Sequence, residues 1–334
     1  MTDGPAAPTT TGSAATGLRR SSDVPLLVRY AREGDTRAVA RLISLVERGD
    51  PALPQLAAAL APYSGHALVV GLTGSPGVGK STTTDGLVRA YRAGGRRVGV
   101  LAVDPSSPYS GGAILGDRVR MQDHATDPGV YIRSMSSRGH LGGLAAATPQ
   151  AIRVLEGAGC DVVLVETVGV GQAEVDIAAV ADTTVVLLAP GMGDAIQAVK
   201  AGILEIADIF LINKADRDGV DATYHDIQGM IALGEREPGY WRPAVLRAVA
   251  VRGEGIDDLV DTIDKHRGWL ESHAQLDARR RHRAAAEVEA IALGTVRARI
   301  AALDGGAALP ALAERVAAGE IDAYAAAAHL LDGI

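Results

Sequence analysis

The sequence predicts an α/β protein in which a largely parallel sheet carries helices on both faces. Apolar runs of strand length occur at residues 68–73, 98–103, 162–166, 184–189 and 208–213, with a weaker run at 245–251. Helical patterns lie between most of these runs, and alternating strands and helices form parallel sheets that are covered on both sides.

Ligands of such sheets bind beyond the carboxyl ends of the strands. The polar residues that end the apolar runs should therefore meet in one crevice. These residues are Gly74 to Ser81, Asp104, Glu166, and Asn213 to Asp216.

Composition narrows the class of protein. The chain has 334 residues, of which 47% are hydrophobic and 22% charged, as in soluble globular proteins. A net charge of −7 leaves no domain-wide basic excess and gives no reason to expect general nucleic-acid binding. We expect no membrane span, since no apolar stretch approaches about 18 residues. The N-terminus also lacks the order of a secretory signal, so the expected location is the cytoplasm. The single cysteine, Cys160, lies beside an apolar run and is expected to be a buried thiol.

The first group of crevice residues completes the pattern G-x-x-x-x-G-K-[ST] between a predicted strand and a predicted helix. Glycines let backbone N–H groups close around phosphate oxygens, and the helix adds the positive end of its dipole. Lys80 is then expected on the outer phosphates and Ser81 on Mg²⁺. The order of strand, loop and helix favours nucleotide binding over an ordinary glycine-rich turn. The expected binding residues are Gly74, Ser75, Pro76, Gly77, Val78, Gly79, Lys80, Ser81 and Thr82.

The second motif, Asn213-Lys-Ala-Asp216, follows the apolar run that ends near residue 212. An aspartate carboxylate can accept from both N1–H and the N2 amine of guanine, whereas adenine lacks that donor pair. A site built around such buried hydrogen bonds rejects the wrong nucleotide by about 10⁴–10⁵-fold. We therefore expect Asp216 to select guanine, Lys214 to lie along the base and Asn213 to brace the loop.

Three acidic residues are candidate metal ligands. Glu166, in Glu166-Thr-Val-Gly169, ends a strand and could hold the Mg²⁺ shell while the Gly169 N–H contacts a γ-phosphate. This is the logic of a D-x-x-G switch with glutamate in place of aspartate. Asp104 and Asp117 could reach the metal or the attacking water, although lone loop aspartates also stabilise turns. Lys80, Asp104 and Glu166 are the residues expected at the catalytic centre.

Three further residues are switch candidates, each with a simpler structural explanation. Arg138 could stabilise charge on the transferring phosphate, but loop arginines are common. Gln172 could orient water, although its offset from Glu166 differs from that of the usual switch glutamine. Lys200 could belong to a mobile loop or be a surface lysine. The water-activating residue stays open.

The sequence predicts four segments. The composition of residues 1–22 indicates a disordered tail. The C-terminal segment should contain one long helix at 275–303, ended by Gly305-Gly306, and two shorter helices. The segments are a tail at 1–22, a helical segment at 23–64, a P-loop GTPase domain at 65–266 and a helical extension at 267–334.

The ordered set of motifs resembles the methylmalonyl-CoA mutase-associated GTPase family, the MeaB/ArgK type. The residues that carry the resemblance are Gly71–Thr82, Val103–Ser107, Ile114–Asp117, Glu166–Gln172, Pro190–Asp208, Asn213–Asp216 and Gly253–Ile256. The similarity runs from about residue 24 to the C-terminus.

The resemblance implies a SIMIBI-class P-loop GTPase that binds GTP or GDP with Mg²⁺. It also implies a chaperone of an adenosylcobalamin-dependent acyl-CoA mutase, which gates cofactor loading and protects or reactivates the mutase. By analogy, Lys80, Ser81, Asp104, Asp117 and Glu166 serve phosphate and Mg²⁺ binding. Lys200 falls in a loop that signals to the mutase, and the C-terminal helices form the dimerisation arm of a homodimer.

One loop departs from the family pattern. The guanine-contacting loop of the family usually reads Ser-Ala, whereas this chain has Val249-Ala250-Val251. The Ala250 N–H should still reach guanine O6, but loss of the serine hydroxyl is expected to loosen the loop.

Two other functions remain as alternatives. A nickel-insertion GTPase would need clustered metal ligands, whereas the eight histidines are scattered singly along the chain. An accessory or kinase component of amino-acid transport is a label this family has sometimes carried. Membrane fractionation with and without GTP would separate the transport function from that of a soluble chaperone.

Overall fold

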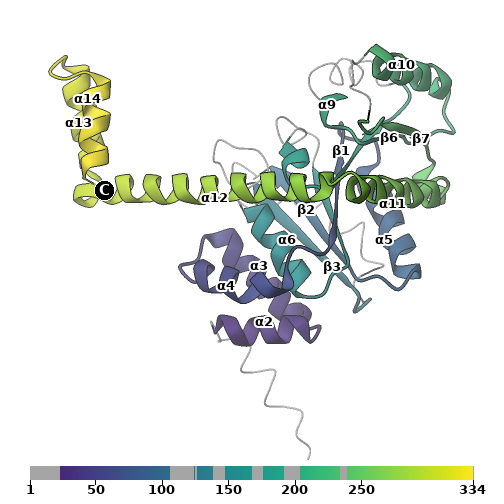
Figure 1. Cartoon of the computed structure of the whole chain (residues 1–334), viewed down its shortest axis with the longest axis horizontal. Coiled ribbons are helices and arrows are strands. Elements are labelled where there is room, and N and C mark those ends of the chain that lie inside the picture. The colour runs from purple at the N-terminus through teal and green to yellow at the C-terminus, as the bar shows by residue number, and fades with distance from the viewer. Residues whose placement is uncertain are drawn as a thin grey trace, which may run out of the picture. The chain divides into compact units, whose positions relative to one another are not determined.

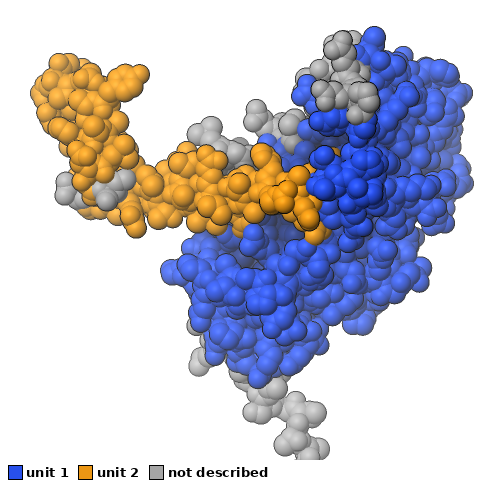
Figure 2. Space-filling view, in the orientation of Figure 1, with its two compact units in different colours: residues 1–276 blue, residues 277–334 orange. Residues whose placement is uncertain are grey.

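The computed structural model describes residues 23–105, 124, 126–137, 147–167, 176–191, 204–233 and 239–333. The chain divides into two compact units, residues 1–276 and residues 277–334, which Figure 2 shows in different colours. No helix in the described ranges has the length and apolar character needed to cross a bilayer.

Unit 1 is built on a single seven-stranded sheet. Its order is β3-β2-β4-β1-β5-β6-β7, and every pairing is parallel, which confirms the predicted fold class. The strands are β1 (Leu68–Thr73), β2 (Val98–Pro105), β3 (Val130–Ser137), β4 (Val162–Thr167), β5 (Thr183–Leu188), β6 (Ile209–Ile212) and β7 (Ala244–Arg247).

The strand order reverses beside β1. From β1 the chain moves to β2 and β3 on one side and later to β5, β6 and β7 on the other. The carboxyl end of β1 is therefore the topological switch point, where α/β sheets bind their ligands.

Unit 1 also contains the helices that cover this sheet. They are α2 (Val24–Arg32), α3 (Thr36–Arg48), α4 (Leu53–Leu60), α5 (Lys80–Ala93), α6 (Ala147–Gly157), α9 (Leu204–Ile206), α10 (Val220–Leu233) and α11 (Ile256–Ser272). Short 3-10 turns lie at η1 (Ala61–Tyr63), η3 (Ile177–Ala179) and η5 (Ala250–Arg252).

Alternate side chains of each strand enter opposite cores, because successive strand residues point to opposite faces. Val69 packs in one core with the buried residues of α2, α3, α4 and α6. Leu68 and Val70 pack in the other core with buried residues of α5 and α11. Figure 1 labels these helices and the strands they cover. A third cluster joins Phe210 and Ile212 to Ile227 of α10. The sheet is thus covered on both faces, as predicted.

The sequence prediction missed the edge strand β3. This strand pairs with β2 from Val98↔Val130 to Pro105↔Ser137. Its sequence is not a continuous apolar run, because the polar residues Arg133 and Ser134 interrupt it. Both are only partly buried, whereas the neighbouring Met135 is fully buried. Arg133 forms an ion pair with Glu47 of α3, which ties the N-terminal helices to this edge.

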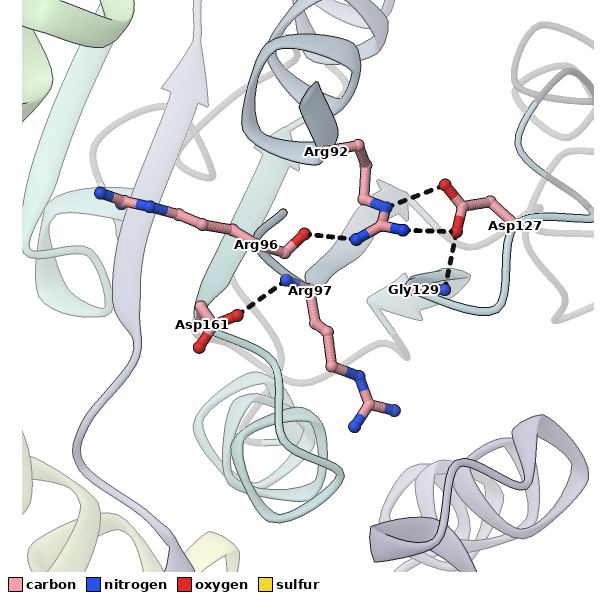
Figure 3. A network of polar contacts seen from close by, with 6 residues as sticks. All are labelled: Arg92, Arg96, Arg97, Asp127, Gly129 and Asp161. Atoms are coloured by element: carbon pink, nitrogen blue, oxygen red, sulfur yellow. Dashed lines mark hydrogen bonds and ion pairs between the residues drawn. The ribbon is translucent and has the colours of Figure 1, made fainter. Parts of the chain in front are cut away.

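A polar network fixes the amino ends of β2 and β3 (Figure 3). The Arg92 guanidinium donates from Nε and Nη2 to the two carboxylate oxygens of Asp127, over 2.8 and 2.9 Å. Asp127 also accepts from the Gly129 N–H over 2.7 Å, and Arg92 donates to the Arg96 carbonyl over 2.8 Å. The Arg92 hydrogen bond, followed by that from Gly129, lowers the pKa of Asp127. The network thus joins the last turn of α5 to the segment just before β2 and to the turn just before β3.

Unit 2 consists of helices. They are α12 (Gln275–Ala302, whose first two residues belong to unit 1), η6 (Leu303–Gly306), α13 (Ala308–Ala317) and α14 (Ala323–Asp332). Gly305 and Gly306 have positive φ, as befits the expected end of the long helix. Asp322 caps α14 by accepting from the N–H groups of Tyr324 and Ala325, so this helix begins at Ala323.

Candidate nucleotide-binding site

The glycine-rich loop joins the end of β1 to the start of α5. Two of its glycines are required by their surroundings. Gly74 has φ 137°, and a Cβ there would overlap the carbonyl oxygen of Leu187 in β5. Gly79 has φ 98°, and a Cβ there would overlap the side-chain amide of Asn213. Both positions therefore need glycine for conformation and for space.

Lys80 opens α5 and is almost fully buried. Its Nζ donates to the carbonyl oxygens of Gly74 over 2.7 Å and Ser75 over 3.0 Å. The ammonium group is therefore held over the loop whose amides are candidates for binding phosphate. A buried ammonium group held at this loop is well suited to meet an anion.

Glu166, at the carboxyl end of β4, meets the first turn of α5. Ser81 Oγ donates to Glu166 Oε1 over 2.6 Å, and Thr84 Oγ1 contacts Glu166 Oε2 over 2.9 Å. Glu166 and Thr84 are buried and Ser81 is nearly so. The buried donor set is a carboxylate with two hydroxyls, which are oxygen ligands of the kind that Mg²⁺ prefers. The residues present therefore fit a magnesium ion.

The Asn213-Lys-Ala-Asp216 loop is joined to the phosphate loop. Asn213 Nδ2 donates to the Val78 carbonyl over 2.8 Å, and Lys214 Nζ donates to the Gly77 carbonyl over 2.6 Å. Lys214 has φ 58°, a left-handed conformation that is uncommon outside glycine. The side chain of Asp216 is 42% exposed, so it can reach an incoming base.

The loop that begins at Val249 is closed by its backbone. Val249 N–H donates to the Glu254 carbonyl over 3.0 Å, and Arg252 N–H donates to the Val249 carbonyl over 2.8 Å. These bonds join backbone groups and need no serine hydroxyl, and the looser loop expected from the missing hydroxyl stays a prediction. The Ala250 N–H donates to Asn213 Oδ1 over 3.0 Å, so a guanine O6 would have to share or replace that acceptor.

Several expected residues cannot be placed. Asp117, Arg138, Gly169, Gln172 and Lys200 lie outside the described residues. The backbone of Asp104 is described as part of β2, but its side chain is not. Within the described ranges, no group of three or more His, Cys, Asp or Glu side chains is arranged to hold a metal ion.

Sequence reasoning missed Thr84 and Arg252. Thr84 lies one helical turn beyond Lys80, on the face that meets Glu166, and that spacing could have identified it. Arg252 lies near Asp216 but 36 residues further along the chain, and no local pattern links the two.

A parallel sheet with a glycine-rich phosphate loop after β1 and an N-K-x-D loop after β6 defines a P-loop GTPase. The family model described as methylmalonyl-CoA mutase-associated GTPase MeaB matches residues 39–304. The chain therefore belongs to the MeaB family: it binds guanine nucleotide and hydrolyses GTP.

Known relatives agree with this assignment. A protein of Pyrococcus abyssi whose name places it among the GTPases is 48% identical over 311 residues, which cover 92% of this chain and 96% of that protein. The GTPase ArgK of Escherichia coli is 41% identical over 70% of this chain and 72% of its own length. The mouse mitochondrial methylmalonic aciduria type A homolog is 42% identical over 63% of this chain and 52% of its own length.

One solved structure is also similar. The crystal structure of the LAO/AO transport system kinase superposes with a TM-score of 0.70 at 27% identity, covering 93% of this chain and 97% of the other.

Proposed function

We propose that this GTPase is a chaperone of an adenosylcobalamin-dependent acyl-CoA mutase of the methylmalonyl-CoA mutase type. It would gate cofactor loading and protect or reactivate the mutase. The observation that carries the proposal is the match of residues 39–304 to a family described as mutase-associated. The 42% identity to the mouse methylmalonic aciduria type A homolog supports it.

The proposed nucleotide site has three parts. The amides of the loop from Gly74 to Thr82 and Lys80 Nζ bind the phosphates, and the Gly169 N–H contacts the γ-phosphate. The loop of Asn213, Lys214 and Asp216, with Val249, Ala250 and Val251, binds guanine. Ser81, Glu166, Asp104 and Asp117 would hold Mg²⁺, which supplies charge neutralisation at the phosphates.

The contacts around Glu166 suggest how nucleotide state would reach a partner. The carboxylate accepts from Ser81 and Thr84 of α5, and Glu166 and Thr167 are the last two residues of β4. We expect a change at the phosphates to alter these acceptor contacts and thereby the carboxyl end of β4. Arg138, Gln172 and Lys200 remain candidates for carrying that signal.

We also propose that the protein acts as a homodimer. Support comes from large apolar side chains that unit 2 exposes to solvent. They include Val288, Ile291 and Leu293 of α12, Leu309 of α13, and Tyr324 and Leu331 of α14. Large apolar side chains left exposed to solvent are typical of interaction surfaces when they gather in a patch. Sedimentation of the full chain should give twice the monomer mass. A monomer at all concentrations would contradict the proposed homodimer.

The partner proposal is tested by binding to a purified adenosylcobalamin-dependent methylmalonyl-CoA mutase. Complex formation and cofactor loading are measured with GDP, with a non-hydrolysable GTP analogue and without nucleotide. We expect both to differ between the GDP and GTP-analogue states. Asp216→Asn supplies a matched control. Its complex formation and cofactor loading should respond to a non-hydrolysable XTP analogue in place of the GTP analogue. No complex in any state would overturn the proposal.

The fate of the γ-phosphate distinguishes the proposed GTPase chaperone from the alternative function, a kinase component of amino-acid transport. A GTPase releases it as inorganic phosphate, whereas a kinase transfers it to an acceptor. With γ-labelled GTP we expect all label to be recovered as inorganic phosphate. Stoichiometric label on a second protein would instead support the kinase function.

A further inference from the structure

Arg252 lies between two carboxylates on the guanine side of the proposed site. Its Nε is 2.9 Å from Glu254 Oε1, and its Nη2 is 3.7 Å from Asp216 Oδ2. The first distance is that of a hydrogen-bonded ion pair. The second exceeds hydrogen-bond length and is an ion pair only. The guanidinium is therefore shared unequally, with Glu254 as the closer partner.

The backbone fixes this arrangement. Arg252 N–H donates to the Val249 carbonyl over 2.8 Å, and Gly253 N–H donates to the Ala250 carbonyl over 3.1 Å. Gly253 adopts φ 75°, which turns the chain so that residues 252 and 254 flank it. The Ala215 N–H donates to the Ala248 carbonyl over 3.0 Å, which holds the loop of Asp216 beside this turn.

Guanine presents to Asp216 an edge of N1–H, C2 and N2–H₂, which has the connectivity of a guanidine. Arg252 carries the same kind of donor group, with a positive charge added. Both therefore compete for the same carboxylate. We propose that Arg252 is an internal competitor for Asp216, which weakens guanine-nucleotide binding, and that Glu254 limits this competition by holding Arg252 away. This inference rests on the proposed role of Asp216 in reading guanine.

The arrangement predicts opposite effects for two variants that remove one charge each. Arg252→Gln removes the competitor, so the dissociation constant for GDP should fall. Glu254→Gln releases Arg252 to pair more closely with Asp216, so the dissociation constant should rise. Both side chains of the Arg252–Asp216 pair are about half exposed, so each change should be about 1.5- to 5-fold. If Arg252 and Glu254 merely braced the loop, both variants would weaken binding.

The experiment is calorimetric titration of the full-length protein with GDP. Arg217→Gln is the control, because it removes the same charge one residue beyond Asp216 and should change affinity by less than about 1.5-fold. The ratio between wild type and Arg252→Gln should also approach one at about 1 M salt, where the Debye length falls to about 3 Å.

The double variant Asp216→Asn with Arg252→Gln completes the design. With the carboxylate gone, Arg252→Gln should no longer alter GDP affinity. If Asp216→Asn leaves the preference for guanosine over xanthosine diphosphate unchanged, the proposed base-reading function fails. If that preference changes but Arg252→Gln and Glu254→Gln shift affinity in the same direction, or not at all, only the competition by Arg252 is overturned.

Discussion

The side-chain amide of Asn213 donates to the carbonyl of Val78 over 2.8 Å, and this bond joins the loop after β6 to the loop after β1. The same side chain accepts from the Ala250 N–H over 3.0 Å. One buried amide thus connects the three loops that are proposed to hold phosphate and base. The geometry of the site depends on this residue as much as on the residues that would touch the nucleotide.

Gly79→Ala should abolish GDP binding, because the added Cβ would displace the Asn213 side chain. Gly77→Ala is the matched control. Both glycines have positive φ, but a Cβ at Gly77 meets no atom within 4 Å. The control therefore carries only the conformational strain, about 1–2 kcal/mol. Calorimetry should show a much larger loss of GDP affinity for Gly79→Ala, and equal losses would show that the Asn213 contact is unimportant.

Thr84→Val should lower magnesium-dependent GTP hydrolysis, because it removes a hydroxyl contact to the buried Glu166. Leaving a buried acceptor short of a partner costs about 1–3 kcal/mol. The neighbouring Thr83 is also fully buried, but its Oγ1 has no hydrogen-bond partner among the described residues. Thr83→Val should therefore retain activity and stability. Comparable losses in both variants would indicate a general packing effect in α5.

Asp127→Asn should destabilise unit 1 at neutral pH by roughly 1–2 kcal/mol, because the Arg92 fork loses its charged partner. The pKa of Asp127 is lowered in the folded protein, mainly by Arg92 and then by the Gly129 N–H. The stabilisation is therefore complete above the ordinary value of 3.8 and is lost as pH falls through the lower folded value.

Urea unfolding between pH 7 and pH 2.5 measures this dependence. The difference between wild type and Asp127→Asn should shrink below about pH 4. Arg92→Lys keeps the charge but removes the fork, so it should show an intermediate loss. A difference that stays constant down to the lowest pH would contradict the assignment.

Cys160 should be inert to thiol reagents while the protein is folded. It is fully buried, and burial raises the pKa of its thiol to about 12. The thiolate that reacts is thus both scarce and inaccessible at neutral pH. With a disulfide reagent, we expect one equivalent to react in denaturant and almost none within an hour in native buffer. Rapid stoichiometric labelling of the native protein would refute the buried environment.

Local patterns predicted most of the fold and the phosphate loop. The runs at 68–73 and 208–213 correspond to β1 and β6, because buried parallel strands are continuously apolar. The strand β3 was missed because an edge strand needs only partial burial, and Arg133 and Ser134 interrupt its apolar character. Strand prediction by apolar runs is therefore strongest at the centre of the sheet.

Long-range contacts could not be predicted in the same way. The pairing of Arg252 with Asp216, and of Asn213 with Val78, depends on how strands distant in sequence are ordered in the sheet. The backbone bonds that close the turn at Val249 likewise arise from the geometry of the whole loop around Gly253.

The most direct test of the proposed site is nucleotide specificity after Asp216→Asn. Asparagine offers one acceptor and one donor, which complement N1–H and the C2 carbonyl of xanthine but not the two donors of guanine. Affinity for GTP should fall at least about a hundredfold, while affinity for XTP rises above that for GTP. Unchanged preference for GTP in this variant would contradict the guanine-binding site described here.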